Sequence, residues 1–127
     1  MLNKGLRDQE SIRIDNVLKT LLAIVFVPKF WNLEDIINVE EQLKDFGLNL
    51  QSLIDCSEKD LITQLLRCHL DWNQLEQFAD FLVISSKDNP FDFSEKAIAI
   101  YNYIQQESKM FSFGINSKIA AAKTNLE

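Results

Sequence analysis

The sequence predicts an all-α fold of five to six antiparallel helices. Only 3 of the 127 residues are glycine and only 2 are proline, too few for the many tight turns of an all-β domain. Apolar residues recur three and four positions apart in several stretches, which is typical of helices with one buried face. The breaks between these stretches are short and favour antiparallel neighbours. The length suits a single helical domain over residues 1–127.

The first predicted helix is amphipathic and covers about residues 9–27. Its end is apolar on nearly every side, through Phe26 and Val27, so it must be buried or form an interface. Pro28 ends it. The buried row consists of Ile14, Val17, Leu18, Leu21, Ile24 and Val25.

The second predicted helix begins behind Asn32, a good N-cap, with acidic residues in its first turn. Its apolar row ends at Phe46. Gly47 then supplies the left-handed residue that commonly ends a helix, and Leu48 is expected to fold back on the last turn.

Polar caps mark the helices in the middle of the chain. A short turn of helix is expected at residues 50–55, behind Asn49. Ser57 opens the next helix, and Asp60 makes a near capping box with it. Asp71 caps a fourth long helix.

The C-terminal part begins with the clearest loop of the sequence, residues 85–89, followed by Pro90. The periodicity then predicts a helix over about residues 94–107 and a last one over about 111–123.

Charge is distributed unevenly along the chain. The net charge is −6, which disfavours a nucleic-acid partner, because phosphate binding needs a basic face. Residues 1–29 carry +2, residues 30–95 carry −10 and residues 96–127 carry +2. Either the middle is a solvated acidic surface, or the basic ends dock on it, within one chain or between two.

The sequence shows neither a membrane span nor a cleavable leader. Its longest apolar run, Leu21–Val27, is seven residues, whereas a span needs about twenty. Cys56 and Cys68 are too few for a disulfide framework and fit a reducing compartment. We therefore expect a cytoplasmic protein.

Residues suited to catalysis or metal binding are scarce. His69 is the only histidine, and its neighbour Cys68 points to another face of the helix. With Cys56 twelve residues away, the four ligands of a zinc site are not assembled. There is no phosphate loop, nucleophile elbow or dinucleotide fingerprint. The sequence thus predicts no catalytic residue, metal or cofactor, and a protein that is not an enzyme.

Aromatic residues at helix ends and in loops are the main functional signal. Such residues either cap the core or form an exposed cluster that anchors a partner. The candidate partner-binding residues are Phe26, Phe30, Trp31, Phe91 and Phe93.

Residues 72–123 resemble a degenerate tetratricopeptide repeat. That family places Trp and Leu on its first helix, and Ala, an aromatic residue and a small or apolar residue on its second. The small Ala lets the two helix backbones approach. The resemblance implies TPR-like packing of helical hairpins in the C-terminal half. The matching residues are Trp72, Leu75, Ala97, Tyr101 and Ile104.

The order of parts also resembles a group of small uncharacterised bacterial helical proteins that has no assigned activity. It runs from the amphipathic first helix through residues 46–50 and 57–62 to the TPR-like end. We expect a non-enzymatic protein–protein interaction or self-association module, whose partner is another protein or a second copy. A dimer through the first helix is the simplest version. The alternative is a small-ligand-binding protein or enzyme with an unrecognised pocket between helices, involving His69 or Tyr103.

Overall fold

The computed structural model describes residues 2–26, 31–87, 92–109 and 112–126. Every regular element in these ranges is helical, which confirms the all-α prediction. Seven α-helices exceed the predicted five to six, because the expected short turn at residues 50–55 is a helix of its own. The elements are α1 (Leu2–Ile24), α2 (Leu33–Leu43), the 3₁₀ turn η1 (Lys44–Phe46), α3 (Leu50–Asp55), α4 (Glu58–Arg67), α5 (Trp72–Ser85), α6 (Ser94–Ser108) and α7 (Phe113–Leu126).

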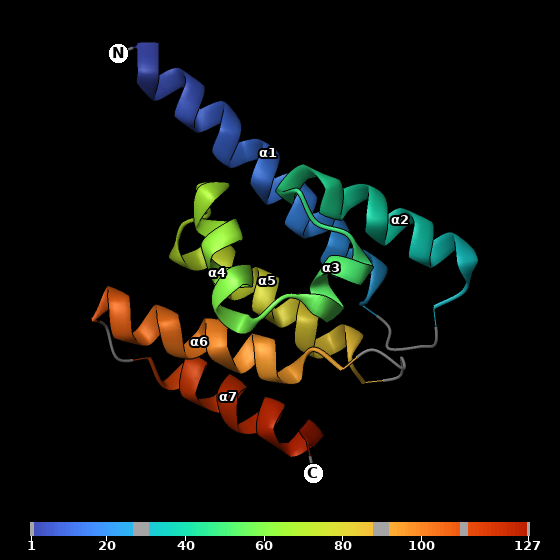
Figure 1. Cartoon of the computed structure of the whole chain (residues 1–127). Helices are drawn as coiled ribbons and strands as arrows, with labels where there is room; N and C mark the ends of the chain where they lie inside the picture. The colour runs from blue at the N-terminus through green and yellow to red at the C-terminus, as the bar shows by residue number, and fades with distance from the viewer. Residues whose placement is uncertain (1, 27–30, 88–91, 110–111, 127) are drawn as a thin grey trace.

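Helix α5 is the central element of the fold. It packs against α1 and against α6, and α7 packs on α6 (Figure 1). Helix α2 lies against α1, and α4 contacts α6. The N-terminal part of α1 projects beyond the other helices (Figure 1).

Helix α1 differs from its predicted bounds of about 9–27 at both ends. It begins at Leu2, because each residue added to a helix already nucleated costs little compared with forming the first turn. It ends at Ile24, where the last turn tightens. The Phe26 N–H donates to the carbonyl of Ala23, three residues back, at 3.4 Å. Val27 and Pro28 lie outside the described residues.

Side-chain caps fix where α2, α3, α4 and α5 begin. The side chains of Asn32, Asn49 and Asp71 each accept from the backbone N–H three residues on. In return, the backbone N–H of each of these residues donates to the side chain three residues on, which completes a capping box. Ser57 forms only half of the expected box: its Oγ accepts from the Asp60 N–H at 3.0 Å. The predicted N-caps are therefore confirmed.

Gly47 ends the α2–η1 segment as predicted. Its φ is 69°, in the left-handed region. Its N–H donates to the Lys44 carbonyl at 2.9 Å, and the Leu48 N–H donates to the Leu43 carbonyl at 3.0 Å. This pair of bonds is the Schellman motif, and it folds the buried Leu48 back on the helix.

We expect Gly47→Ala to lower the free energy of unfolding by more than about 1 kcal/mol, because alanine is strained at positive φ. The added Cβ would also lie 2.7 Å from Gln64 Nε2, which donates to the Phe46 carbonyl at 2.8 Å. Urea denaturation measures the loss. Gly114→Ala is the matched control: its Cβ meets only Ser112 Oγ, at 3.6 Å, so the helix α7 should be unharmed. Equal effects of the two substitutions would contradict the assignment.

The C-terminal elements follow the sequence closely. Helix α5 continues through Ser85, so it overlaps the first residue of the predicted 85–89 loop, whose last two residues lie outside the described ranges. Helix α6 ends one residue later than predicted. Helix α7 begins at Phe113 and continues past the predicted end at 123. Residue 111, where the prediction began, lies outside the described residues.

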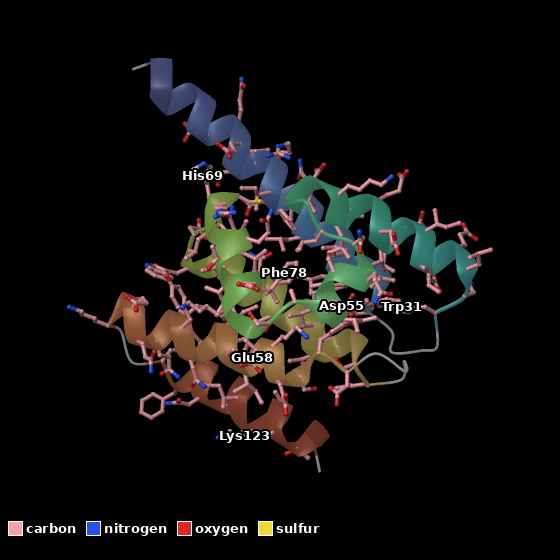
Figure 2. All side chains as sticks on the ribbon, in the orientation of Figure 1. Trp31, Asp55, Glu58, His69, Phe78 and Lys123 are labelled. Carbon is pink, nitrogen blue, oxygen red and sulfur yellow. The ribbon has the colours of Figure 1, made fainter. Side chains whose placement is uncertain are left out.

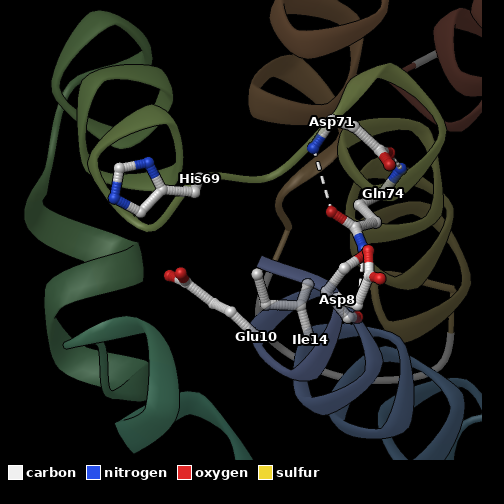
Figure 3. A pocket seen from close by; sticks show the side chains of 7 residues that line it. Asp8, Glu10, Ile14, His69, Asp71 and Gln74 are labelled. Carbon is white, nitrogen blue, oxygen red and sulfur yellow. Dashed lines mark hydrogen bonds between the residues drawn. The ribbon is translucent and has the colours of Figure 1, made fainter. Parts of the chain in front are cut away.

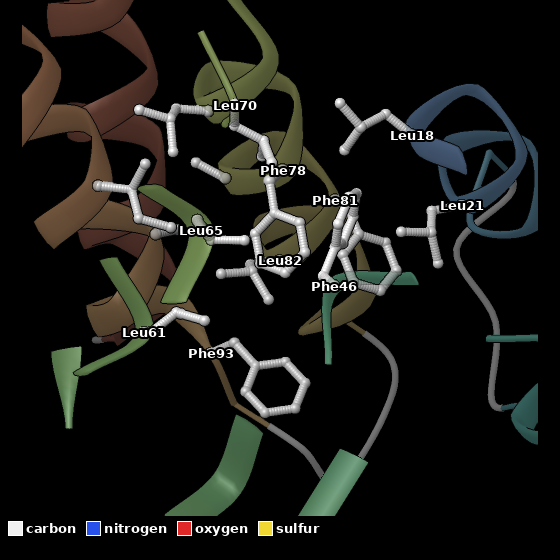
Figure 4. Packing of buried hydrophobic residues seen from close by; sticks show 14 of the residues in the cluster. Leu18, Leu21, Phe46, Leu61, Leu65, Leu70, Phe78, Phe81, Leu82 and Phe93 are labelled. Atoms are coloured by element: carbon white, nitrogen blue, oxygen red, sulfur yellow. The ribbon is translucent and has the colours of Figure 1, made fainter. Parts of the chain in front are cut away.

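The core is one cluster with members from every helix. Phe78 of α5 lies at its centre and is completely buried (Figure 4). Its ring meets Phe46 edge-on at 5.9 Å and Phe81 at 5.8 Å between centroids. Leu18 and Leu21 of α1 are fully buried too. In the apolar end of this helix, Leu21 and Val25 are buried and Phe26 is exposed, so the end is only partly used inside the chain.

Candidate functional site

The five aromatic candidates have different environments. Phe26 is 81% exposed, at the end of α1. Trp31 is half-buried and stacks on Phe81, with centroids 6.5 Å apart. Phe93 is 1% exposed and belongs to the core, so as folded it cannot anchor a partner. Phe30 and Phe91 lie outside the described residues. The structure therefore presents one of the described candidates, Phe26, fully to solvent.

A surface on α2 was not singled out by the sequence. Leu33 and Ile37 are 73% and 53% exposed, and they lie one turn apart on the same side of the helix. We call this side the α2 outer face; its exposed residues are Leu33, Glu34, Ile37, Asn38 and Glu41. The sequence pattern of α2 predicted only its buried side.

Ion pairs join the basic ends of the chain to its acidic middle. Arg13 of α1 lies 3.6 Å from Asp45. Lys118 of α7 pairs with Glu76 and Asp80 of α5. Among the described residues, one basic side chain of each end thus pairs with the acidic middle within one chain. The Arg13 pair is half-exposed and adds little to stability.

The cysteines and the histidine have structural positions. His69 has φ 69° and ends α4, because its N–H and that of Leu70 donate to the last carbonyls of the helix. The Cys68 thiol lies 3.6 Å from the Phe46 carbonyl, and burial raises the pKa values of the Cys56 and Cys68 thiols. Across the described part of the chain, no three His, Cys, Asp or Glu side chains gather as metal ligands.

A polar pocket of about 440 Å³ lies between α1 and the start of α5. His69 and Glu10 lie on one side of it, and Asp8 and Gln74 on the other (Figure 3). His69 and Trp31 are at different ends of the molecule (Figure 2). The remaining lining residues are Ser11, Ile14 and Asp71.

Gln74 accounts for most of the polar bonding at this pocket. Only 2% exposed, it accepts from the Asp71 N–H at 2.9 Å and donates to Asp15 at 2.9 Å and to Ser11 Oγ at 3.1 Å. Asp71 in turn caps α5. The hydrogen bonds of these side chains join α1 to α5. The polar groups of this pocket therefore stabilise the fold.

A second pocket, of about 310 Å³, is mainly apolar and lies among α1, α5, α6 and α7. We call it the Tyr101 pocket. Its lining consists of Leu22, Asp80, Val83, Ile84, Tyr101, Lys118 and Ala121. A polar network borders it. The buried Tyr101 hydroxyl donates to Asp80 Oδ1 at 2.6 Å, and Lys118 Nζ donates to Asp80 Oδ2 at 3.0 Å and to Glu76 Oε2.

The network fixes the protonation states at neutral pH. Burial raises the pKa of Tyr101 strongly, and the hydrogen bond to Asp80 raises it further, so the phenol stays neutral. Burial alone would lower the pKa of Lys118. The hydrogen bonds to Glu76 and Asp80 outweigh burial and raise that pKa, so the ammonium stays charged.

This network was not predicted from the sequence, although part of its signal is present there. Glu76 and Asp80 are the two acidic residues of the otherwise mostly apolar α5, and they lie four positions apart on one face. Their cation, Lys118, is 38 residues beyond Asp80. No spacing rule connects positions so distant.

Comparison with protein-family models, with curated protein sequences and with solved structures finds no match for this chain. Within the described ranges, none of the helices has the length and apolar character needed to cross a bilayer.

Proposed function

We propose that the protein is a non-enzymatic protein–protein interaction module that uses the α2 outer face. The observation that carries this proposal is the exposure of Leu33 and Ile37, side by side on one helix, in a chain that buries most of its other large aliphatic residues. Exposed apolar side chains gathered on one helix face are typical of docking surfaces for amphipathic helices. Phe26, at the end of α1, is a further exposed apolar residue.

The charge of α2 indicates the kind of partner. The helix carries four acidic residues and no basic one. Two copies of this face brought together would place like charges opposite one another, which disfavours a symmetric dimer here. A partner helix with an apolar stripe and basic flanks matches both features. The partner is therefore a protein with a basic amphipathic segment.

The C-terminal hairpin supports the same role. Ala97 and Tyr101 are buried on α6, which packs against α5, and TPR-like packing of this hairpin is part of the proposal. Helix α2 itself is supported by α1, against which it packs. The free thiols of Cys56 and Cys68 fit the proposed cytoplasmic location.

Binding of a synthetic amphipathic helix built of leucine and lysine tests the proposal. We expect Ile37→Glu to weaken that binding about tenfold, because it removes an apolar contact worth about 1.4 kcal/mol. The substitution also adds an acid, so adsorption by charge alone would become stronger. Isothermal titration calorimetry measures the affinity.

Ile12→Glu is the matched control. Ile12 is 58% exposed on α1, so the residue type, the exposure and the added charge are the same as at Ile37. Its affinity should equal that of the unmodified chain. Unchanged or stronger binding by Ile37→Glu would contradict the proposal.

Sedimentation of the chain alone should show a monomer. A dimer that is disrupted by Ile37→Glu and not by Ile12→Glu would assign the α2 outer face to a second copy of the chain instead.

A further inference from the structure

The Tyr101 pocket combines apolar walls with a single ion pair. Its walls come from three helices and consist of Leu22, Val83, Ile84 and Ala121. The volume of about 310 Å³ is at the lower end of the range for small-molecule sites. A few polar groups on a mainly apolar pocket are the usual pattern of such a site. None of the lining residues belongs to α2, so a ligand here would be independent of docking on the α2 outer face.

The charged side chains that line the pocket are already paired with each other. Lys118 Nζ lies 3.0 Å from Asp80 Oδ2, so the lining has no net charge. Glu76 does not line the pocket, but it accepts a second bond from Lys118. A cationic ligand would therefore meet an ammonium group, and an anionic ligand would meet Asp80 with Glu76 behind it. A charged ligand would lose hydration in the pocket without gaining a free counter-charge.

One donor of the lining has no partner within the described part of the chain. An ammonium group has three N–H donors, and Lys118 uses two of them, for Asp80 Oδ2 and Glu76 Oε2. Burial opposes the charge of Lys118, but the bonds to Glu76 and Asp80 outweigh burial and raise its pKa, so the third N–H is present at neutral pH. The Tyr101 hydroxyl already donates to Asp80. What the pocket can still bind is therefore a hydrogen-bond acceptor.

We propose that the Tyr101 pocket binds a small neutral molecule with an apolar body and one carbonyl oxygen, the body against Leu22, Val83 and Ala121 and the oxygen accepting from Lys118. The body gains by leaving water. The bond from an ammonium group to the oxygen is charge-assisted, and therefore stronger than a bond from a neutral donor. A hydrocarbon of the same shape gains only from burial of its body.

Four aromatic compounds of similar size test this order: acetophenone, ethylbenzene, benzylammonium and benzoate. Titrations followed by amide NMR shifts give the dissociation constants and locate the site. We expect acetophenone to bind about fivefold tighter than ethylbenzene and about tenfold tighter than either charged compound. The shifts should include Val83, Ile84 and Ala121. Absence of saturable binding, tighter binding of any of the other three compounds, or shifts confined to other residues would overturn the proposal.

Ala121→Glu tests where the ligand lies. Ala121 is three positions after Lys118 on α7, so a glutamate side chain there can accept the third N–H and also adds a charge to the apolar wall. We expect acetophenone to bind about tenfold more weakly. Ala120→Glu is the matched control, because Ala120 is also exposed on α7 and does not line the pocket. Its affinity should equal that of the unmodified chain.

Both alanines are exposed, so neither substitution should unfold the chain. Equal affinities of the two variants for acetophenone would exclude the Tyr101 pocket as the site.

Discussion

Phe78→Ala is expected to lower the free energy of unfolding by about 3–5 kcal/mol, which is a large part of the 5–15 kcal/mol that stabilises a typical domain. The Phe78 ring is fully buried and touches Phe46 of η1 and Phe81 of its own helix. Truncation of the ring leaves a cavity between α5 and η1. Because α5 is the central helix, its neighbours cannot close on the cavity without losing other contacts.

Urea denaturation followed by circular dichroism measures this loss, with Phe26→Ala as the control. Phe26 is 81% exposed, so the same truncation there should change stability by less than about 0.5 kcal/mol. A loss at Phe78 as small as that at Phe26 would show that the core is not packed as described.

Tyr101→Phe is expected to lower the free energy of unfolding by about 2 kcal/mol at pH 7, because it removes a hydrogen bond to a partly buried carboxylate. The lost bond is the one from the Tyr101 hydroxyl to Asp80, at 2.6 Å. Tyr103→Phe is the control: the Tyr103 ring lies 6.1 Å from Trp72, outside the network. It should have a much smaller effect.

The cost of Tyr101→Phe should shrink in alkaline solution. The pKa of Tyr101 is raised in the folded chain, mainly by burial, above its ordinary value of 10.0. Above pH 10 the unfolded chain therefore loses this proton while the folded chain keeps it. The stability that Tyr101 contributes is complete below pH 10 and declines as the pH rises further, by up to about 1.4 kcal/mol per pH unit. Urea titrations at pH 7 and pH 11 measure this; a cost independent of pH would contradict it.

Local rules of sequence were enough to predict most helix boundaries. Asn32, Asn49 and Asp71 cap helices because their side chains bond to a backbone N–H three residues away, an interaction contained within a few positions. Gly47 is predictable for the same reason, since the left-handed residue directly follows the apolar row. The start of α1 was not predictable, because its first turns have no apolar periodicity to mark them.

The candidate sites depended on long-range contacts, and the sequence predicted them poorly. Phe93 and Phe26 are both aromatic residues at helix boundaries, yet one is buried and the other exposed. Which of them faces solvent depends on how distant helices pack over them. The network of Asp80, Tyr101 and Lys118 likewise requires three helices to meet. The spacing of residues within one helix does not indicate which distant helices will pack against it.

The position of the first turns of α1 determines how they remain helical. Its first turns have no neighbouring helix to pack against (Figure 1), so they stay helical by continuing a helix already nucleated further along. The bonds of Gln74 to Ser11 and Asp15 lie near the inner limit of that part. A backbone break just before Ser11 would release everything ahead of it into coil, whereas a break within the packed part would leave both fragments held by their neighbours.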